Sequence, residues 1–243
     1  MGRLIAIFIL AIVALPCYGQ GSVQQSRPVA AVPVMAKTDL LAQFSQLDID
    51  GPIRITLHKV ATAEEVKIVF DTKGDITTKF KADVDAKGVL RISERPDPAR
   101  TATTEVELYY THLSSVKVAR AQAVFKDALA NDLLDVRISG GAIVTLPIEA
   151  LDVDVECTGR SSVILSGTTR YLTMNVSTAK VDAAKFTTMA TTVKASHAAD
   201  VTVNVTERLE AATATSARLS YKGKPRILRN RTQLFGGDIT AIE

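Results

Sequence analysis

A short pattern recurs along the second half of the chain at a nearly constant interval of about 19 residues, and self-similarity at a fixed period is the signature of a repeat architecture. Each unit has an apolar-polar-apolar signature, a small polar stretch and the start of a second apolar strand. The signatures are Val116-Lys-Val118, Val136-Arg-Ile138, Val153-Asp-Val155, Met174-Asn-Val176, Val193-Lys-Ala195 and Ala212-Thr-Ala214, and the second strands start at Val124, Ile143, Val163, Val181, Val201 and Leu219. Units of this length are typical of a β-solenoid, in which successive coils stack at about 4.8 Å.

Alternation of apolar and polar residues also runs through the first half of the folded part. Ile53-Arg-Ile55-Thr-Leu57, Leu90-Arg-Ile92 and Val106-Glu-Leu108 each place apolar side chains on one face of a strand. The sequence therefore predicts an all-β fold, a single-stranded right-handed β-helix. A β-sandwich is the alternative, although a sandwich gives no reason for the layout within each unit to repeat. Only Ala121 to Leu134 is a helix candidate, and its apolar residues can also be divided between two strands.

Residues 1–19 have the features of a signal peptide. Arg3 precedes the uncharged apolar stretch Leu4 to Leu15, which falls well short of the roughly 20 residues of a membrane span. Pro16 ends this stretch, and Cys17-Tyr18-Gly19 offers small residues for cleavage before Gln20. We therefore expect export. Lipid attachment at Cys17 is the alternative, which Pro16 disfavours because a lipobox has a small residue in that place.

The remaining chain divides into a tether and one folded domain. Residues 20–39 contain Pro28, Pro33 and three glutamines with little periodicity, which predicts a flexible tether. Residues 40–243 are expected to form the solenoid domain, with stacked coils clearest in 113–221. No later window approaches a membrane span, because charged or hydroxyl residues interrupt every apolar run.

Composition excludes some function classes and favours none. Lys plus Arg number 29 against 26 Asp plus Glu, so the net charge of +3 does not indicate nucleic acid or an anionic membrane as partner. Aromatic residues make up 5% and Trp is absent, which argues against sugar-stacking grooves and base-stacking platforms. Common hydrolase, metalloprotease and nucleotide-binding motifs are missing, and Cys157, the one cysteine of the mature chain, alternates with buried-type valines. We expect no enzyme activity, no cofactor and no metal.

Two groups of polar residues are candidate metal sites. Asp152, Asp154 and Glu156 alternate with apolar residues and lie on one face of a strand, where they could hold Ca²⁺ or form a solvated outer face. Stacking by the signatures above places Arg137 and Asn175 beside Asp154, which favours the solvated face. His58, His112 and His197 lie far apart without metal-ligand spacing and are expected to be surface or turn residues.

A basic cluster lies near the C-terminus. It consists of Lys222, Lys224, Arg226, Arg229 and Arg231, five cations within ten residues. Clustered cations bind anionic polymers such as acidic polysaccharides because counterions are released on binding. The alternative is that these charges protect the exposed last coil from end-to-end stacking.

Several segments together resemble a known family. They are Phe44-Ser-Gln-Leu47-Asp-Ile49-Asp-Gly51, Leu90-Arg-Ile92, the stacked repeats, Leu219-Ser-Tyr221-Lys-Gly223-Lys-Pro225 and Gly236-Gly237-Asp-Ile239. The chain resembles, from roughly Phe44 to Ile242, the putative auto-transporter adhesin, head GIN domain family of secreted bacterial β-proteins. Members usually place Ser-Gly-x-Gly at coil corners; here glycine stands only at Ser139-Gly140-Gly141 and Thr158-Gly159. The resemblance implies a β-helical fold and an adhesin role, and brings no catalytic residues.

These observations favour one function class over two others. We expect an exported, non-enzymatic cell-surface or envelope protein, an adhesin that binds extracellular polymers such as an anionic glycan. Its location would be periplasmic, cell-surface or extracellular, with no nucleic acid partner. A structural envelope scaffold and a β-helical carbohydrate-active enzyme are the alternatives.

Overall fold

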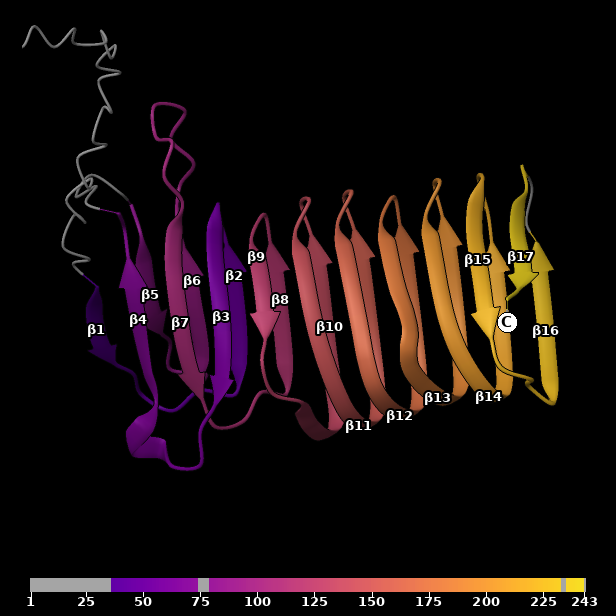
Figure 1. Ribbon diagram of the computed structural model, residues 1–243, viewed down its shortest axis with the longest axis horizontal. Helices are drawn as coiled ribbons and strands as arrows, with labels where there is room; N and C mark the ends of the chain where they lie inside the picture. The colour runs from indigo at the N-terminus through magenta and orange to yellow at the C-terminus, as the bar shows by residue number, and fades with distance from the viewer. Residues whose placement is uncertain (1–35, 74–78, 233–234, 243) are drawn as a thin grey trace, which may run out of the picture. The chain divides into compact units, whose positions relative to one another are not determined.

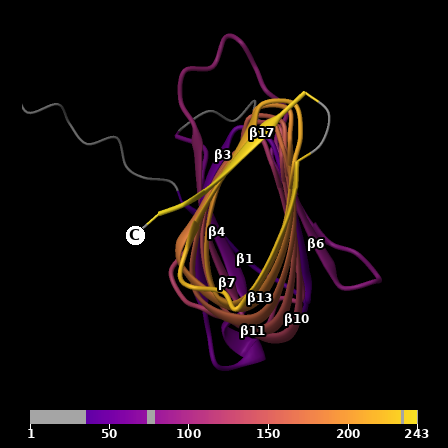
Figure 2. The ribbon, with the colours of Figure 1, turned by 90° about the vertical axis from the view of Figure 1, so that its right-hand side faces the viewer.

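A computed structural model describes residues 36–73, 79–232 and 235–242, which belong to one compact unit. The expected signal peptide, its cleavage site and nearly all of the tether lie outside the described residues and stay predictions. Within the described part the chain winds as a β-solenoid of stacked coils (Figure 1). Viewed along the stack, the coils nearly superpose as a flattened ring (Figure 2). The expected all-β solenoid is confirmed.

The described elements are seventeen strands and one short 3-10 turn. The strands are β1 (Lys37–Leu40), β2 (Gln46–Asp50), β3 (Ile53–Lys59), β4 (Lys67–Asp71), β5 (Lys81–Val84), β6 (Val89–Ser93), β7 (Thr104–Tyr110), β8 (Ser115–Ala119), β9 (Gln122–Phe125), β10 (Leu129–Ser139), β11 (Ile143–Thr158), β12 (Ser162–Ser177), β13 (Lys180–Ser196), β14 (Asp200–Thr213), β15 (Ala217–Lys222), β16 (Ile227–Thr232) and β17 (Gly237–Ala241). The 3-10 turn η1 (Ala63–Glu65) precedes β4. In the described ranges no helix has the length and apolarity needed to cross a membrane.

Each coil has two flat sides, and we name the two sheets by their strands. The first sheet contains β5, β6, β2, β8, the C-terminal halves of β10 to β14, and β16. The second sheet contains β1, β4, β7, β3, β9, the N-terminal halves of β11 to β14, β15 and β17. Strands β11 to β14 are long because each passes from the second sheet around a rounded edge into the first. Tight corners close the opposite edge (Figure 1).

Side chains at alternate positions fill the space between the two sheets. Val136, Val155, Met174 and Val193 lie side by side in consecutive coils, in a parallel register that keeps the same spacing from coil to coil. All four are buried, and their outward neighbours are exposed or half-buried. Burial of a side chain of this size stabilises the fold by roughly 1.5–3 kcal/mol. The repeat seen in the sequence is therefore a stack of core layers.

The register differs from the expected one at two signatures. Val155, not Val153, pairs with Val136, and Ala211, not Ala212, pairs with Val193. Period-two patterning cannot distinguish Val153 from Val155, because both point inward. The Ala-Thr-Ala signature was ambiguous for a related reason, since alanine occurs on both faces of β14. The expected strand starts at Val124 and Ile143 are outward residues beside the buried Ala123 and Val144.

The segment from Ala121 to Leu134 contains no helix. It forms β9 and the first half of β10, as the two-strand alternative had it. Ala121, Ala123 and Phe125 are buried while Gln122 and Val124 are exposed. This period of two belongs to a strand, and it places Phe125 in the core beside Tyr110.

The N-terminal coils do not stack in sequence order. Strands β2 and β3 form a coil that lies between the β6–β7 coil and the β8–β9 coil. The chain passes outward from β3, returns through β6 and β7, and only then continues to β8. Antiparallel strands β1, β4 and β5 cover the outer side of this region (Figure 1). The first of them begins at Lys37, within the expected tether.

A buried ion pair holds the long connection between β6 and β7. Arg100 donates to Glu94, and it also donates to the carbonyl oxygen of Thr72 at 3.1 Å. The Thr104 hydroxyl donates to the same Glu94 carboxylate at 2.9 Å. The Glu94 and Arg100 side chains are 1% and 10% exposed. This network joins the connection to the outermost coils.

The C-terminal end is built differently. β16 pairs with β14 and β17 pairs with β15, so among the described strands each leaves one edge unpaired. Between β15 and β16 the backbone of Gly223 approaches the preceding coil so closely that an added Cβ would lie 2.1 Å from the carbonyl oxygen of Val205. Its φ of +95° also favours glycine. The glycine in the Tyr-x-Gly-x-Pro segment is therefore required by close packing of the last coils.

Candidate functional site

The basic cluster lies on the last coils of the solenoid. Lys222 ends β15, Lys224 and Arg226 lie in the connection that follows, and Arg229 and Arg231 belong to β16. Lys224, Arg226 and Arg229 are exposed and Lys222 is half-buried. Figure 1 shows these strands at the end of the stack opposite to β1.

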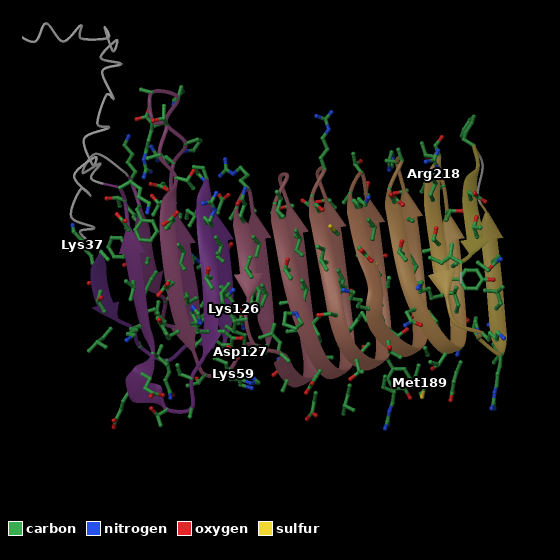
Figure 3. All side chains as sticks on the ribbon, viewed as in Figure 1. Lys37, Lys59, Lys126, Asp127, Met189 and Arg218 are labelled. Atoms are coloured by element: carbon green, nitrogen blue, oxygen red, sulfur yellow. The ribbon has the colours of Figure 1, made fainter. Side chains whose placement is uncertain are left out.

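Arg218 adds a sixth cation to this end. Residues 217–232 contain six Lys or Arg residues and no Asp or Glu. Figure 3 places Arg218 at the edge of the tight corners, whereas Met189 lies at the opposite, rounded edge. The six cations are therefore distributed around the last coils, with Arg218 on the second sheet, Lys222, Lys224 and Arg226 toward the rounded edge, and Arg229 and Arg231 on the first sheet. We call these six residues the basic end.

Four cations of the basic end form no ion pair with the described part of the chain. They are Arg218, Lys222, Lys224 and Arg226. Arg229 differs, because its guanidinium lies 3.1 Å from the carboxylate of Glu210 on β14. Arg208 donates to the same carboxylate oxygen, and its hydrogen bond is the main reason that the pKa of Glu210 is lowered. These four charges are available to an external anion.

A groove lies beside the basic end on the outer surface of the first sheet. It has a volume of about 360 Å³ and crosses β13, β14 and β16. Its outward-facing lining residues are Thr192, Lys194, Ser196, Glu210, Ala212, Ala214 and Arg229. This groove has no signature in the sequence, because its residues come from three coils. Only the observed register, which pairs Lys194 with Ala212 and Ala212 with Arg231, brings them together.

The carboxylate row is a solvated face with a different neighbourhood from the expected one. Asp154 and Glu156 are exposed and Asp152 is half-buried. Arg137 and Asn175 flank Glu156 in the register, not Asp154, because Val155 takes the position expected for Val153. Arg137 lies 3.8 Å from Glu156. Nowhere in the described ranges do three His, Cys, Asp or Glu side chains gather as a metal site.

The histidines and the cysteine are on separate elements. His58 on β3 stacks on Tyr109 with ring centroids 5.0 Å apart, His112 follows β7, and His197 forms a tight corner. Cys157 is buried in the core, as expected, and burial raises the pKa of its thiol to about 12. A thiol in this state is a poor nucleophile at neutral pH.

Together these features define a parallel β-solenoid with one cationic end. Solved structures share the fold: a putative adhesin from Bacteroides fragilis matches with a TM-score of 0.74 at 16% identity, over 86% of this chain and 96% of that one. A putative adhesin from Parabacteroides merdae has a TM-score of 0.63 at 16% identity, over 86% and 95% of the two chains. A putative lipid-binding protein from Parabacteroides distasonis has a TM-score of 0.63 at 12% identity, over 86% and 96%.

The family is shown by the sequence itself. The family model of the putative auto-transporter adhesin, head GIN domain matches residues 43–225. The chain belongs to this family, as the resemblance indicated. No curated protein shows significant similarity to it.

Proposed function

We propose that this protein is an exported, non-enzymatic adhesin that binds anionic extracellular or envelope polymers through its basic end. Family membership supports a surface protein of the adhesin type. The observation that carries the proposed ligand is the charge of residues 217–232, which contain six cations and no carboxylate. The described carboxylate of this last coil, Asp238 on β17, lies beside Arg218. Long polyanions bind such clusters because each neutralised charge releases a counterion.

The geometry of the solenoid supports this proposal. Parallel coils form a stiff repeating surface along which weak contacts with a polymer can add together. The antiparallel strands β1, β4 and β5 occupy the other end, so the two ends offer a ligand different surfaces. The imidazole of His197 is hydrogen-bonded to the hydroxyls of Ser177 and Ser196, and no described carboxylate is hydrogen-bonded to it.

The test compares wild-type protein with two variants of equal charge. One replaces Lys222, Lys224, Arg226, Arg229 and Arg231 with Gln. The matched control replaces five exposed lysines of the N-terminal coils with Gln, namely Lys37, Lys59, Lys79, Lys81 and Lys87. Binding to immobilised polygalacturonate and to neutral dextran is measured, together with the melting temperature.

We expect wild-type protein and the control to bind polygalacturonate and not dextran, and the basic-end variant to lose binding while its melting temperature stays nearly unchanged. Equal loss in both variants would mean that net charge alone causes retention. If the basic-end variant binds as well as wild-type protein, the basic end is not the binding site. Release of shorter chains from polygalacturonate would contradict the non-enzymatic function. If no polymer binds, the scaffold alternative stands.

A further inference from the structure

The floor of the groove beside the basic end is formed by small side chains on the outer side of the sheet. Ala212 on β14 and Ala214 just after this strand provide it, because their methyl groups rise little above the backbone. Lys194 on β13 flanks Ala212, and Arg229 on β16 flanks Glu210, two residues before Ala212. Neighbouring strands lie about 4.8 Å apart, so β13 and β16 enclose a gap of about 10 Å with β14 as its base. This gap admits a ring-shaped ligand lying on the alanines.

The groove contains one cation and one carboxylate with different surroundings. Lys194 is exposed, and none of the described carboxylates forms an ion pair with it. Glu210 lies on β14, two residues before Ala212, where Arg208 and Arg229 both contact its Oε1. The contacts of Glu210 with described residues thus leave Oε2 as an acceptor. The groove therefore offers an unpaired cation on one wall and a fixed carboxylate acceptor at one end of its floor.

This arrangement selects among anionic ligands. An acidic peptide side chain or a phosphate diester could pair with Lys194, but neither group itself carries a hydroxyl donor for Glu210. A hexuronate brings one carboxylate for Lys194, hydroxyl donors for Glu210 and a C–H face for the alanines. Aromatic residues are absent from the groove lining, so a neutral sugar would lack both a stacking surface and a charge contact.

We propose that this groove binds one hexuronate residue of an anionic polysaccharide, with the sugar carboxylate on Lys194, a ring hydroxyl donating to Glu210, and the ring lying over Ala212 and Ala214. This inference rests on the proposed function and names its sugar class. The groove recognises one residue, and the basic end holds the neighbouring charges of the same chain.

Two variants test the groove without substituting any residue of the five-residue cluster. Ala212→Leu fills the floor with no change of charge, and Lys194→Gln removes the cation. Their matched controls are Ala190→Leu, a half-buried alanine of β13 outside the groove, and Lys180→Gln, an exposed lysine on the second sheet. Calorimetry is done with trigalacturonate, with neutral galactotriose and with triglutamate.

We expect wild-type protein and both controls to bind trigalacturonate and neither of the other two ligands. Ala212→Leu, which fills the space for the ring, and Lys194→Gln, which removes a charge-assisted contact, should each weaken this binding at least about tenfold. If Ala212→Leu leaves the affinity for trigalacturonate unchanged, the groove is not the binding site. This conclusion would hold even if polygalacturonate still binds at the basic end. Equal binding of triglutamate would overturn the sugar class. A third variant carries Lys222→Gln, Lys224→Gln and Arg226→Gln, and it separates the two proposals. It should weaken the binding of polygalacturonate and leave the binding of trigalacturonate unchanged.

Discussion

At the residue scale, the tight corners show how this chain tolerates a backbone that usually calls for glycine. Thr178, His197, Ala198, Thr215 and Ser216 all have φ between 52° and 60°. For residues with a Cβ this left-handed conformation costs about 1–2 kcal/mol each. The chain accepts this cost at corners where members of its family usually have glycine, so its corners carry strain that the stacked strands hold in place.

Ala198 offers the cleanest test of this strain, because its side chain is only a methyl group. We expect Ala198→Gly to raise the free energy of unfolding by about 0.5–1 kcal/mol, since glycine relieves the left-handed strain but is more flexible in the unfolded chain. The neighbouring Ala199 is buried, and Ala199→Gly should instead destabilise the fold. Urea denaturation measures both changes. A loss of stability in both variants would show that the corner is not strained.

At the scale of the element, strands were predicted correctly wherever inward and outward residues differ in type. The parallel coils of the second half follow from alternation and from a nearly constant repeat interval, both of which are visible along the sequence. The predicted register was wrong at β11 and β14. In β11, successive inward positions hold valine or cysteine, which are chemically alike, and in β14 alanine occurs on both faces. The out-of-order coil formed by β2 and β3 could not be predicted, because the residues of a strand do not specify which other strands will pair with it.

The observed register of β11 makes a sharp prediction about two adjacent residues. Val155 is fully buried between Val136 and Met174, so Val155→Asp should destabilise the protein by at least about 3 kcal/mol. Asp154 is exposed and pairs in register with Asp135, so Asp154→Val should change stability by no more than about 0.5 kcal/mol. Chemical denaturation with circular dichroism checks both. Equal destabilisation by the two substitutions would contradict the register.

At the scale of the whole folded unit, the two ends of the solenoid have different structures. Antiparallel strands cover one end, whereas the other is formed by parallel strands β16 and β17, each with one edge that no described strand pairs. The basic residues were found from the sequence because they are close together along the chain. The groove was not, since Lys194, Ala212 and Arg229 become neighbours only after three coils have stacked in a register that the pattern left ambiguous.

The central claim is that unpaired cations on the last coils bind an anionic polymer. The dissociation constant for polygalacturonate, measured by calorimetry at several NaCl concentrations, tests it most directly. Counterion release predicts that affinity falls on the order of tenfold to a hundredfold between about 50 and 200 mM salt, and that the basic-end variant with five glutamines loses this dependence. Affinity that does not change with salt in the wild-type protein, or an unchanged slope in the variant, would contradict the claim.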